Sequence, residues 1–529
     1  MFTPPSATVP LITRKKLFSL RHSRAARNAA ASYVAFFSTA ITGLIAIPLS
    51  VHFLTKQELG LWAVILAVGS YLNFMEMGLG FATGRKMADA IVAKDKTEID
   101  RWWTLTRIIL TIQGILVIAI GLALAPLFMS QLAADYPDKR QAMFLYVGMV
   151  ILQGVKLPFQ GAEGILTAQE RFHWVPLRQS LIFWVELAVI AACFFSGLGL
   201  YSMIWAQAAT LLVVWILNWA LLAQSEPKLG WNASGLQWSR VRSLFGFSLS
   251  IAGVAMIETV ARSLPVMILG RSGGLAMVPI YTISNKVATV LSGLGRRTYH
   301  SFYPALQRMF IQGDLVTFRD KYSKIGTISA ATGLGIAGFV LCFNRMAVEL
   351  LAKPGFYAGA VATTWFAVAT ITIPVGGFLQ LPLLAAGKMG KSVLVAMIRL
   401  VVGLLLCIIA FFQFGIDGLA AVSALLPIFL GAYGFVRGAR ECGSKPWELS
   451  GRTVVWTVAA VFIVILGGYL NSVLPAGQLV IQVFSKDVAL PGWSEITIGG
   501  IICLLASVLF AHSLRNLRIP HSPQSPAET

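Results

Sequence analysis

The sequence predicts an all-α polytopic membrane protein with about 14 transmembrane helices. Of its 529 residues, 57% are hydrophobic and only 12% are charged, whereas soluble domains are about a quarter charged. The mean hydropathy is +0.75. The apolar residues come in blocks of roughly 20, the length that a helix needs to cross a bilayer. Continuous apolar runs such as "GILVIAIGLALAPLF" (114–128) argue against the alternating pattern of a transmembrane β-barrel.

Each apolar block becomes one expected span, joined to the next by a short polar connection. The first 28 residues are basic and polar and lack the apolar stretch of a cleavable signal peptide. The expected spans are 29–53, 60–81, 107–130, 141–166, 179–197, 200–222, 245–269, 275–298, 325–350, 360–386, 392–413, 417–436, 453–474 and 495–514.

The positive charges predict the orientation of these spans. Fourteen spans put both termini on one side, and with that side inside, the inside segments hold 31 Lys and Arg against 7 in the outside loops. This asymmetry predicts that both termini are cytoplasmic. It also accounts for most of the net charge of +20. Because that charge is spread over every inside loop, a nucleic-acid partner is not expected.

Two short motifs predict an internal repeat. The expected spans 60–81 and 275–298 each contain "GLG" near the end, at 78–80 and 293–295, and the spans before them carry Pro48 and Pro265. Two copies of six spans share one orientation, as in transporters built from parallel repeats. The expected organisation is a basic cytoplasmic tail (1–28), an N-lobe (29–223), a cytoplasmic linker (224–244), a C-lobe (245–437), two additional helices (453–514) and a cytoplasmic tail (515–529).

Three segments resemble a known family. "FLTKQELGLWAVILAVGSYLNFMEMGLGFA" (53–82) resembles the second-helix region of polysaccharide flippases of the multidrug/oligosaccharidyl-lipid/polysaccharide exporter superfamily. "GILTAQERFHWVPL" (164–177) and "LLAAGKMGKSVLVA" (383–396) resemble the turns after their fourth and tenth helices. The resemblance implies two six-helix lobes that face each other as a V, with helices 1, 2, 7 and 8 lining a central cavity. It also implies alternating access for a lipid-linked sugar.

Eight charged residues fall inside expected spans. A lone charge at the bilayer centre costs ~2.5–3.5 kcal/mol even on the lenient insertion scale, so these side chains are expected to face water or one another. They are Glu76, Lys156, Glu163, Glu186, Glu258, Arg262, Lys286 and Arg399.

The segment "IETVARSL" places Glu258 and Arg262 four residues apart on one helical face, with the acid first. One interpretation is a self-neutralising pair that helps membrane insertion. The other is a cavity site in which Arg262 binds a phosphate and Glu258 responds by changing protonation. In that case Glu258 holds Arg262 while the site is empty, and Pro265 loosens the helix beside them.

The second helix of each expected repeat carries further candidates. In "YTISNKVATVLSG", Lys286 shares a face with Thr282 and Thr289, and Asn285 lies beside it. Lys286 is interpreted either as a contact to substrate phosphate or as the partner of a carboxylate such as Glu258. Asn73 and Glu76 lie three residues apart and are expected on a wet, cavity-facing side of their span.

The remaining intramembrane charges are secondary candidates. Lys156 and Glu163 share a face with Gln160, and a network within one lobe is the favoured interpretation. Arg399 lies near the inside end of its span and is expected to extend its side chain to the interface. Glu186 is alone on its span.

The leading functional hypothesis is a transporter that flips an undecaprenyl-pyrophosphate-linked oligosaccharide for cell-surface polysaccharide synthesis. Arg and Lys inside a membrane suit an anionic pyrophosphate. Its expected partners are this cargo, membrane lipids and a polysaccharide polymerase or export complex. The alternatives are a cation-coupled small-molecule exporter of the same superfamily and, less favoured, a membrane glycosyltransferase or polymerase.

No cofactor, metal or catalytic residue is expected. The turn "GKMGKS" (387–392) lacks the first glycine of a P-loop, and the histidines show no metal-binding spacing. The five cysteines have no CxxC spacing and are expected to be free thiols.

Overall fold

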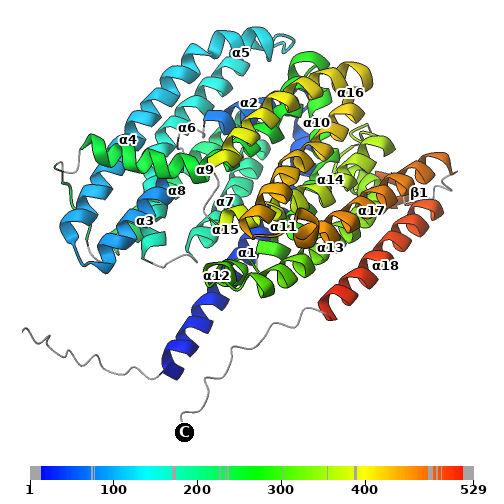
Figure 1. The fold of residues 1–529 in the computed structure, drawn as a ribbon. Helices are drawn as coiled ribbons and strands as arrows, with labels where there is room; N and C mark the ends of the chain where they lie inside the picture. Colours follow the sequence, from blue (N-terminus) through cyan, green and yellow to red (C-terminus); the bar gives the residue numbers. More distant parts are fainter. Residues whose placement is uncertain are drawn as a thin grey trace, which may run out of the picture. The chain divides into compact units, whose positions relative to one another are not determined.

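The structure is a computed structural model in which almost all of the described backbone is helical (Figure 1). The described residues are 14–72, 76, 78–169, 174–224, 228–232, 234, 237–300, 302–353, 355–386, 390–474, 480–483, 486–489 and 491–515. The first 13 residues of the expected N-terminal tail, nearly all of the expected C-terminal tail, parts of the expected linker, and Asn73 lie outside the described residues. The prediction of an all-α membrane protein is confirmed, with one small addition, a two-stranded antiparallel hairpin near the C-terminus.

The helices of the first half of the chain are α1 (Arg14–Phe53), α2 (Lys56–Leu72), α3 (Leu79–Val92), α4 (Lys96–Ala123), α5 (Ala125–Gln131), α6 (Lys139–Ala168), α7 (Trp174–Phe195) and α8 (Tyr201–Ala223). The second half contains α9 (Trp238–Ile268), the π-helical turn η3 (Leu269–Gly273), α10 (Met277–Ser284), α11 (Lys286–His300), α12 (Tyr303–Ile311), α13 (Leu315–Leu351), α14 (Ala360–Phe378) and α15 (Leu381–Ala385). The chain continues with α16 (Gly390–Glu441), α17 (Pro446–Val473), β1 (Val480–Val483), β2 (Lys486–Ala489) and α18 (Trp493–Arg515).

The expected span 60–81 is not one continuous helix. Helix α2 ends at Leu72, Gly78 has a φ of 66°, and α3 begins at Leu79. A positive φ costs glycine little and interrupts the helix at this point. The expected span 275–298 is likewise divided, into α10 and α11 at Asn285. The second helix of each expected repeat is therefore interrupted.

One other prediction about helices needs correction. The expected spans 392–413 and 417–436 run together as α16, which is bent at Gly415, where φ is 59°. Pro265 lies inside α9, which stays helical for three more residues and then continues as the π-helical turn η3. The exact count of 14 spans is not confirmed: among the described residues, ten helices are long and apolar enough to cross a membrane.

The chain divides into two compact units. Unit 1 contains residues 1–46, 79–114 and 155–244, and unit 2 contains residues 47–78, 115–154 and 245–529. Helices α1, α4, α6 and α9 each run from one unit into the other.

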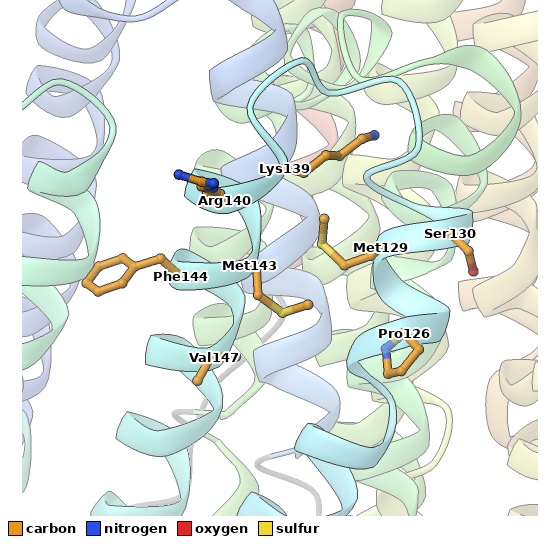
Figure 2. A pocket seen from close by; sticks show the side chains of 8 residues that line it. All are labelled: Pro126, Met129, Ser130, Lys139, Arg140, Met143, Phe144 and Val147. Carbon is orange, nitrogen blue, oxygen red and sulfur yellow. The ribbon is translucent and has the colours of Figure 1, made fainter.

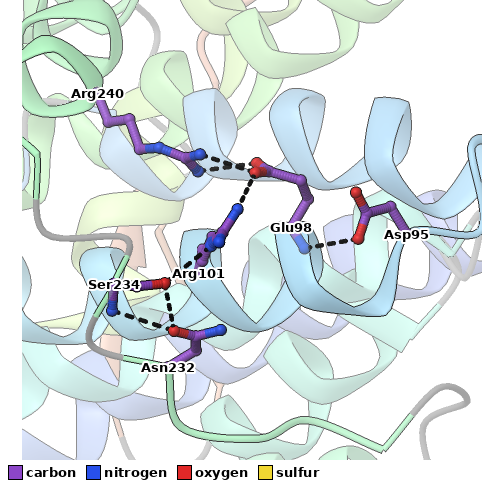
Figure 3. A network of polar contacts seen from close by, with 6 residues as sticks. All are labelled: Asp95, Glu98, Arg101, Asn232, Ser234 and Arg240. Atoms are coloured by element: carbon purple, nitrogen blue, oxygen red, sulfur yellow. Dashed lines mark hydrogen bonds and ion pairs between the residues drawn. The ribbon is translucent and has the colours of Figure 1, made fainter.

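Unit 1 is held together by close helix packing and by a polar network around the start of α4 (Figure 3). A Cβ placed on Gly164 of α6 would lie 2.4 Å from the carbonyl oxygen of Gly80, so the backbones of α3 and α6 are in direct contact. In the polar network, Glu98 binds Arg101 at 2.9 Å and Arg240 at 2.7 and 2.8 Å.

The same network fastens part of the segment 224–244 to α4. The backbone N–H of Gly230 donates to Asp100 at 2.7 Å, and that of Asn232 donates to Thr104 at 2.9 Å. Arg101 also donates to Ser234 at 3.0 Å. This connecting segment is therefore fixed to α4 by several hydrogen bonds in addition to the ion pairs of Glu98.

Unit 2 is built around α13 and α14, whose side chains are largely buried. Helices α17 and α18 both pack against α13 (Figure 1). The contact with α18 is close because Gly338 faces the carbonyl oxygen of Gly499, and the Cys342 thiol lies 2.8 Å from the carbonyl oxygen of Glu495. The two additional helices thus belong to unit 2. All five cysteines are free, as expected.

Within unit 2, segments from the two halves of the sequence meet at one end of α2. The Lys56 ammonium donates to the Gly355 carbonyl at 2.9 Å and lies 4.9 Å from the centre of the Phe356 ring. Val51 and Ile283 pack beside Phe356 in a buried apolar cluster. All of these contacts join segments that the sequence places at outside ends of spans.

We expect Gly60→Ala to destabilise unit 2 by about 1–3 kcal/mol, because a Cβ at this position would overpack the structure. That Cβ would lie 1.8 Å from the carbonyl oxygen of Leu275, a backbone atom that cannot rotate away. Thermal unfolding of the detergent-solubilised protein measures the change. Gly500→Ala in α18 is the control, since no atom lies within 4 Å of its Cβ position. Equal melting temperatures for the two variants would contradict the α2 contact.

We expect Glu98 and Arg240 to be coupled energetically, because their two hydrogen bonds form a bidentate ion pair. A double-mutant cycle of Glu98→Gln and Arg240→Gln should give a coupling of about 1 kcal/mol, which partial solvent exposure keeps modest. The matched control is the exposed pair Asp320 and Lys324, one helical turn apart, where about 0.3–0.5 kcal/mol is expected. A coupling no larger than that of the control would show that the network does not fasten the connecting segment.

Candidate functional site

The candidate site lies in unit 2, where α9, α11 and α16 bring charged side chains together. Helix α9 carries Glu258 and Arg262, α11 carries Arg296, and α16 carries Arg399. Apolar side chains of α9 and α16 interlock, with Val254, Ile257, Ala396 and Leu430 all buried. This packing brings Arg399 next to Glu258.

Glu258 is paired with Arg399, at 2.7 Å between carboxylate and guanidinium. The prediction that Arg399 extends to the membrane interface is therefore wrong: the residue is only 1% exposed, because its face of α16 is packed against α9. The expectation that Glu258 holds Arg262 is also not met. The Nε and Nη2 groups of Arg399 have no hydrogen-bond partner among the described residues, and an orphaned buried donor is costly.

Arg262 is exposed and forms no ion pair or hydrogen bond within the described part of the chain. It is nevertheless desolvated by the protein around it, and Arg296, Glu258, Arg399 and Tyr299 are near enough to act on its charge. The local balance is three guanidinium groups against one carboxylate, so the cluster favours an anion.

The other expected site residues of unit 2 are placed as follows. Asn285 is the C-cap of α10, and Lys286 is the first residue of α11. Glu76 lies between α2 and α3 and is half-buried, as are Asn285 and Lys286. Glu76 and Lys286 both interact with other residues. Asn73 lies outside the described residues.

The secondary candidates belong to unit 1. Lys156 is half-buried on α6 and interacts with other residues, and Glu163 is on the same helix, although its side chain is not among those described. Glu186 is not isolated, because it accepts a hydrogen bond of 2.7 Å from Gln207 of α8.

Two residues of the cluster, Arg296 and Tyr299, are not among the candidates that the sequence predicts, and Arg399 is more deeply buried than expected. Arg296 follows the "GLG" motif directly, where the sequence predicts an inside loop, yet α11 remains helical through both residues. Arg296 lies ten residues from Lys286, close to three helical turns, and that spacing was the available signal. For the pairing of Arg399 with Glu258 there was no local signal, because the two residues are 141 positions apart.

No group of three or more potential metal ligands is found among the described residues. The chemistry that the cluster offers is charge-assisted binding of an oxyanion by guanidinium groups.

The fold is that of transporters of the multidrug/oligosaccharidyl-lipid/polysaccharide exporter (MOP) superfamily. The lipid II flippase MurJ in an inward closed conformation is similar at a TM-score of 0.64 and 14% identity, over 92% of this chain and 100% of that chain. An inward-facing multidrug resistance MATE family transporter is similar at a TM-score of 0.60 and 15% identity, over 77% of this chain and 94% of that chain. A MOP superfamily transporter from Pyrococcus furiosus is described by the reverse polarity of its binding pocket. It is similar at a TM-score of 0.58 and 16% identity, over 79% of this chain and 95% of that chain.

The family is shown by the sequence itself. The profile of a family described as polysaccharide biosynthesis protein matches residues 51–353, more than half of the chain. The chain belongs to this family. Together with the MOP fold, this confirms the resemblance stated from the three sequence segments. No individually curated protein sequence matches the chain.

We expect Arg399→Met to destabilise the protein by on the order of 3 kcal/mol, because it leaves Glu258 without its partner inside the helix packing. The double variant Glu258→Gln/Arg399→Met should recover most of this loss, since it removes both charges. Thermal unfolding in detergent provides the measurement. If Arg399→Met melts at the wild-type temperature, the ion pair does not hold α9 to α16.

Proposed function

We propose that the protein flips an undecaprenyl-pyrophosphate-linked oligosaccharide across the bacterial inner membrane for cell-surface polysaccharide synthesis. The observation that carries the proposal is the exposed Arg262 of unit 2, which forms no ion pair or hydrogen bond among the described residues and lies near Arg296 and Arg399. Membership of a polysaccharide biosynthesis family and the transporter fold are consistent with such a cargo. The solved flippase of similar fold acts on a lipid-linked substrate, lipid II.

The chemistry of the cluster suits a pyrophosphate. Arg262 offers a planar fork of donors that can bind two phosphate oxygens at once. Arg296 adds a second charge nearby, and Arg399 has two donor groups without a hydrogen-bond partner in the described part of the chain. An anion that reached these donors would satisfy them, and the low dielectric around them would strengthen the attraction. A small cationic drug would instead meet repulsion at this surface.

Glu258 is the residue through which a proton gradient could act. While it is charged, it holds Arg399 at 2.7 Å. A proton on Glu258 would weaken that pair and release Arg399 toward the phosphate. The site with a charged Glu258 would then bind the cargo weakly and the site with a protonated Glu258 would bind it tightly, so that protonation and cargo binding favour each other. This role replaces the expected competition between Glu258 and the cargo for Arg262.

The rest of the proposal concerns the arrangement of the chain in the membrane. Both termini would be cytoplasmic, with residues 29–223 and 245–437 as two lobes that alternate access to a central cavity. Asn73, Glu76, Asn285 and Lys286 would add polar surface to this cavity, and Lys156 and Glu163 would form a network within the first lobe. A polysaccharide polymerase or export complex would receive the flipped product.

We expect Arg262→Ala to reduce export of the lipid-linked oligosaccharide roughly 10- to 100-fold, because one charge-assisted interaction of ~1.5–3 kcal/mol is lost. Arg262→Lys should rescue only partly, since Lys lacks the planar fork. The measurement is the accumulation of lipid-linked oligosaccharide on the inner leaflet of cells with equal amounts of each variant. Arg242→Ala, which removes an exposed guanidinium from the first part of α9, is the matched control.

Glu258→Gln should retain binding but make export independent of the proton gradient. If the Arg262→Ala variant exports at the wild-type rate, Arg262 has no role in transport and the proposal is contradicted. A change in drug susceptibility, with polysaccharide export unaltered, would instead favour a cation-coupled small-molecule exporter.

A further inference from the structure

A groove runs between α5 and the first turns of α6, within unit 2 (Figure 2). Its volume is about 800 Å³, and its walls are almost entirely apolar. Pro126 and Met129 come from α5, whereas Met143 and Val147 come from α6. Figure 2 shows Met129 and Met143 pointing toward each other across the groove, with Arg140 above them at the start of α6.

The walls of the groove are fixed by contacts of their own. The Phe128 and Tyr146 rings stack at 4.3 Å, and the Tyr146 hydroxyl donates to the Gly121 carbonyl at 2.8 Å. From the turn between α5 and α6, the Tyr136 hydroxyl donates to the Gln141 side chain. These contacts hold α5 and the first turns of α6 together on the two sides of the groove.

The charged groups at the mouth of the groove differ in whether they form hydrogen bonds to the turn between α5 and α6. The Lys139 ammonium donates to the carbonyl oxygens of Ala133 and Ala134, and Asp138 accepts from the Gln141 backbone N–H at 3.0 Å. Both are thus committed to the turn. Arg140 lines the groove, is exposed, and has no hydrogen bond or ion pair among the described residues.

The surroundings of the groove face hydrocarbon. Leu124 and Leu127 of the α5 region are 42% and 56% exposed, and Phe144 of α6 is 51% exposed. Exposed apolar side chains at this density, on helices that cross a bilayer, lie against lipid chains. Lys139 and Arg140 belong to an expected outside loop, so Arg140 lies where the apolar surface gives way to headgroups.

We propose that this groove binds an anionic phospholipid of the outer leaflet, with one acyl chain between α5 and α6 and the phosphate on Arg140. The apolar walls suit an acyl chain, and the volume is in the range of ligand pockets, roughly 300–1,000 Å³. The free guanidinium at the mouth supplies the charge complementarity. The site is separate from the cluster of Glu258, Arg262 and Arg399 and does not depend on the cargo proposed above.

The test is lipid binding to the full-length protein, purified in detergent and titrated with phosphatidylglycerol or phosphatidylcholine, with bound lipid counted by native mass spectrometry. We expect phosphatidylglycerol to bind more tightly. Arg140→Gln should weaken its binding about fivefold, the effect of roughly one basic residue near a membrane surface. Met143→Trp, which places a large ring between the walls, should weaken both lipids.

Arg271→Gln is the matched control, because Arg271 is an exposed arginine in another expected outside loop and does not line the groove. Equal phosphatidylglycerol binding by wild type and Arg140→Gln would overturn the proposal. So would an equal loss in Arg271→Gln, which would indicate attraction to net charge alone. Competition by glycerophosphoglycerol, the headgroup without chains, at the same concentration as the lipid would also overturn it, since the site would then be one for a free phosphate ester.

Discussion

The ion pair between Glu258 and Arg399 determines how charge is distributed inside unit 2. A guanidinium as deeply buried as that of Arg399 requires a carboxylate, and α9 supplies it at 2.7 Å. Because Glu258 is used in this way, Arg262, one turn further along α9, forms no ion pair among the described residues. The same carboxylate that stabilises the packing of α9 on α16 thereby creates a surplus of positive charge at the neighbouring surface.

The membrane also limits where the helices of the two expected repeats can be interrupted. Irregular backbone at membrane depth is tolerated only where it is buried in protein or lines a wet cavity. Helix α2 ends before Glu76, and α10 ends just before Lys286, so in both expected repeats the break is next to a charged residue. Paired interruptions of this kind are the features by which transporter binding sites are found in sequences.

The fold class could be predicted from composition and block length alone, because the bilayer sets both the length and the polarity of a spanning helix. Charged residues inside expected spans stand out as candidates for the same reason, since a charge within the hydrocarbon needs water or a partner. Glu258 and Arg262 were expected to pair since helical spacing reveals neighbours only along one helix. The true partner, Arg399, is on another helix, and which helices face each other depends on packing that no local pattern encodes. The interruption at Gly78 could not be predicted, because the apolar run of this expected span continues to residue 81.

The contact between Gly60 and Leu275 has a consequence for the evolution of this family. At Gly60 the contact depends on the lack of a side chain. At Leu275 it depends on a backbone carbonyl oxygen, which every amino acid has. A substitution at one position therefore has no compensating substitution at the other. Correlated changes among related sequences would reveal many neighbouring pairs in such a protein, yet this meeting of two backbones would leave only a solitary invariant glycine.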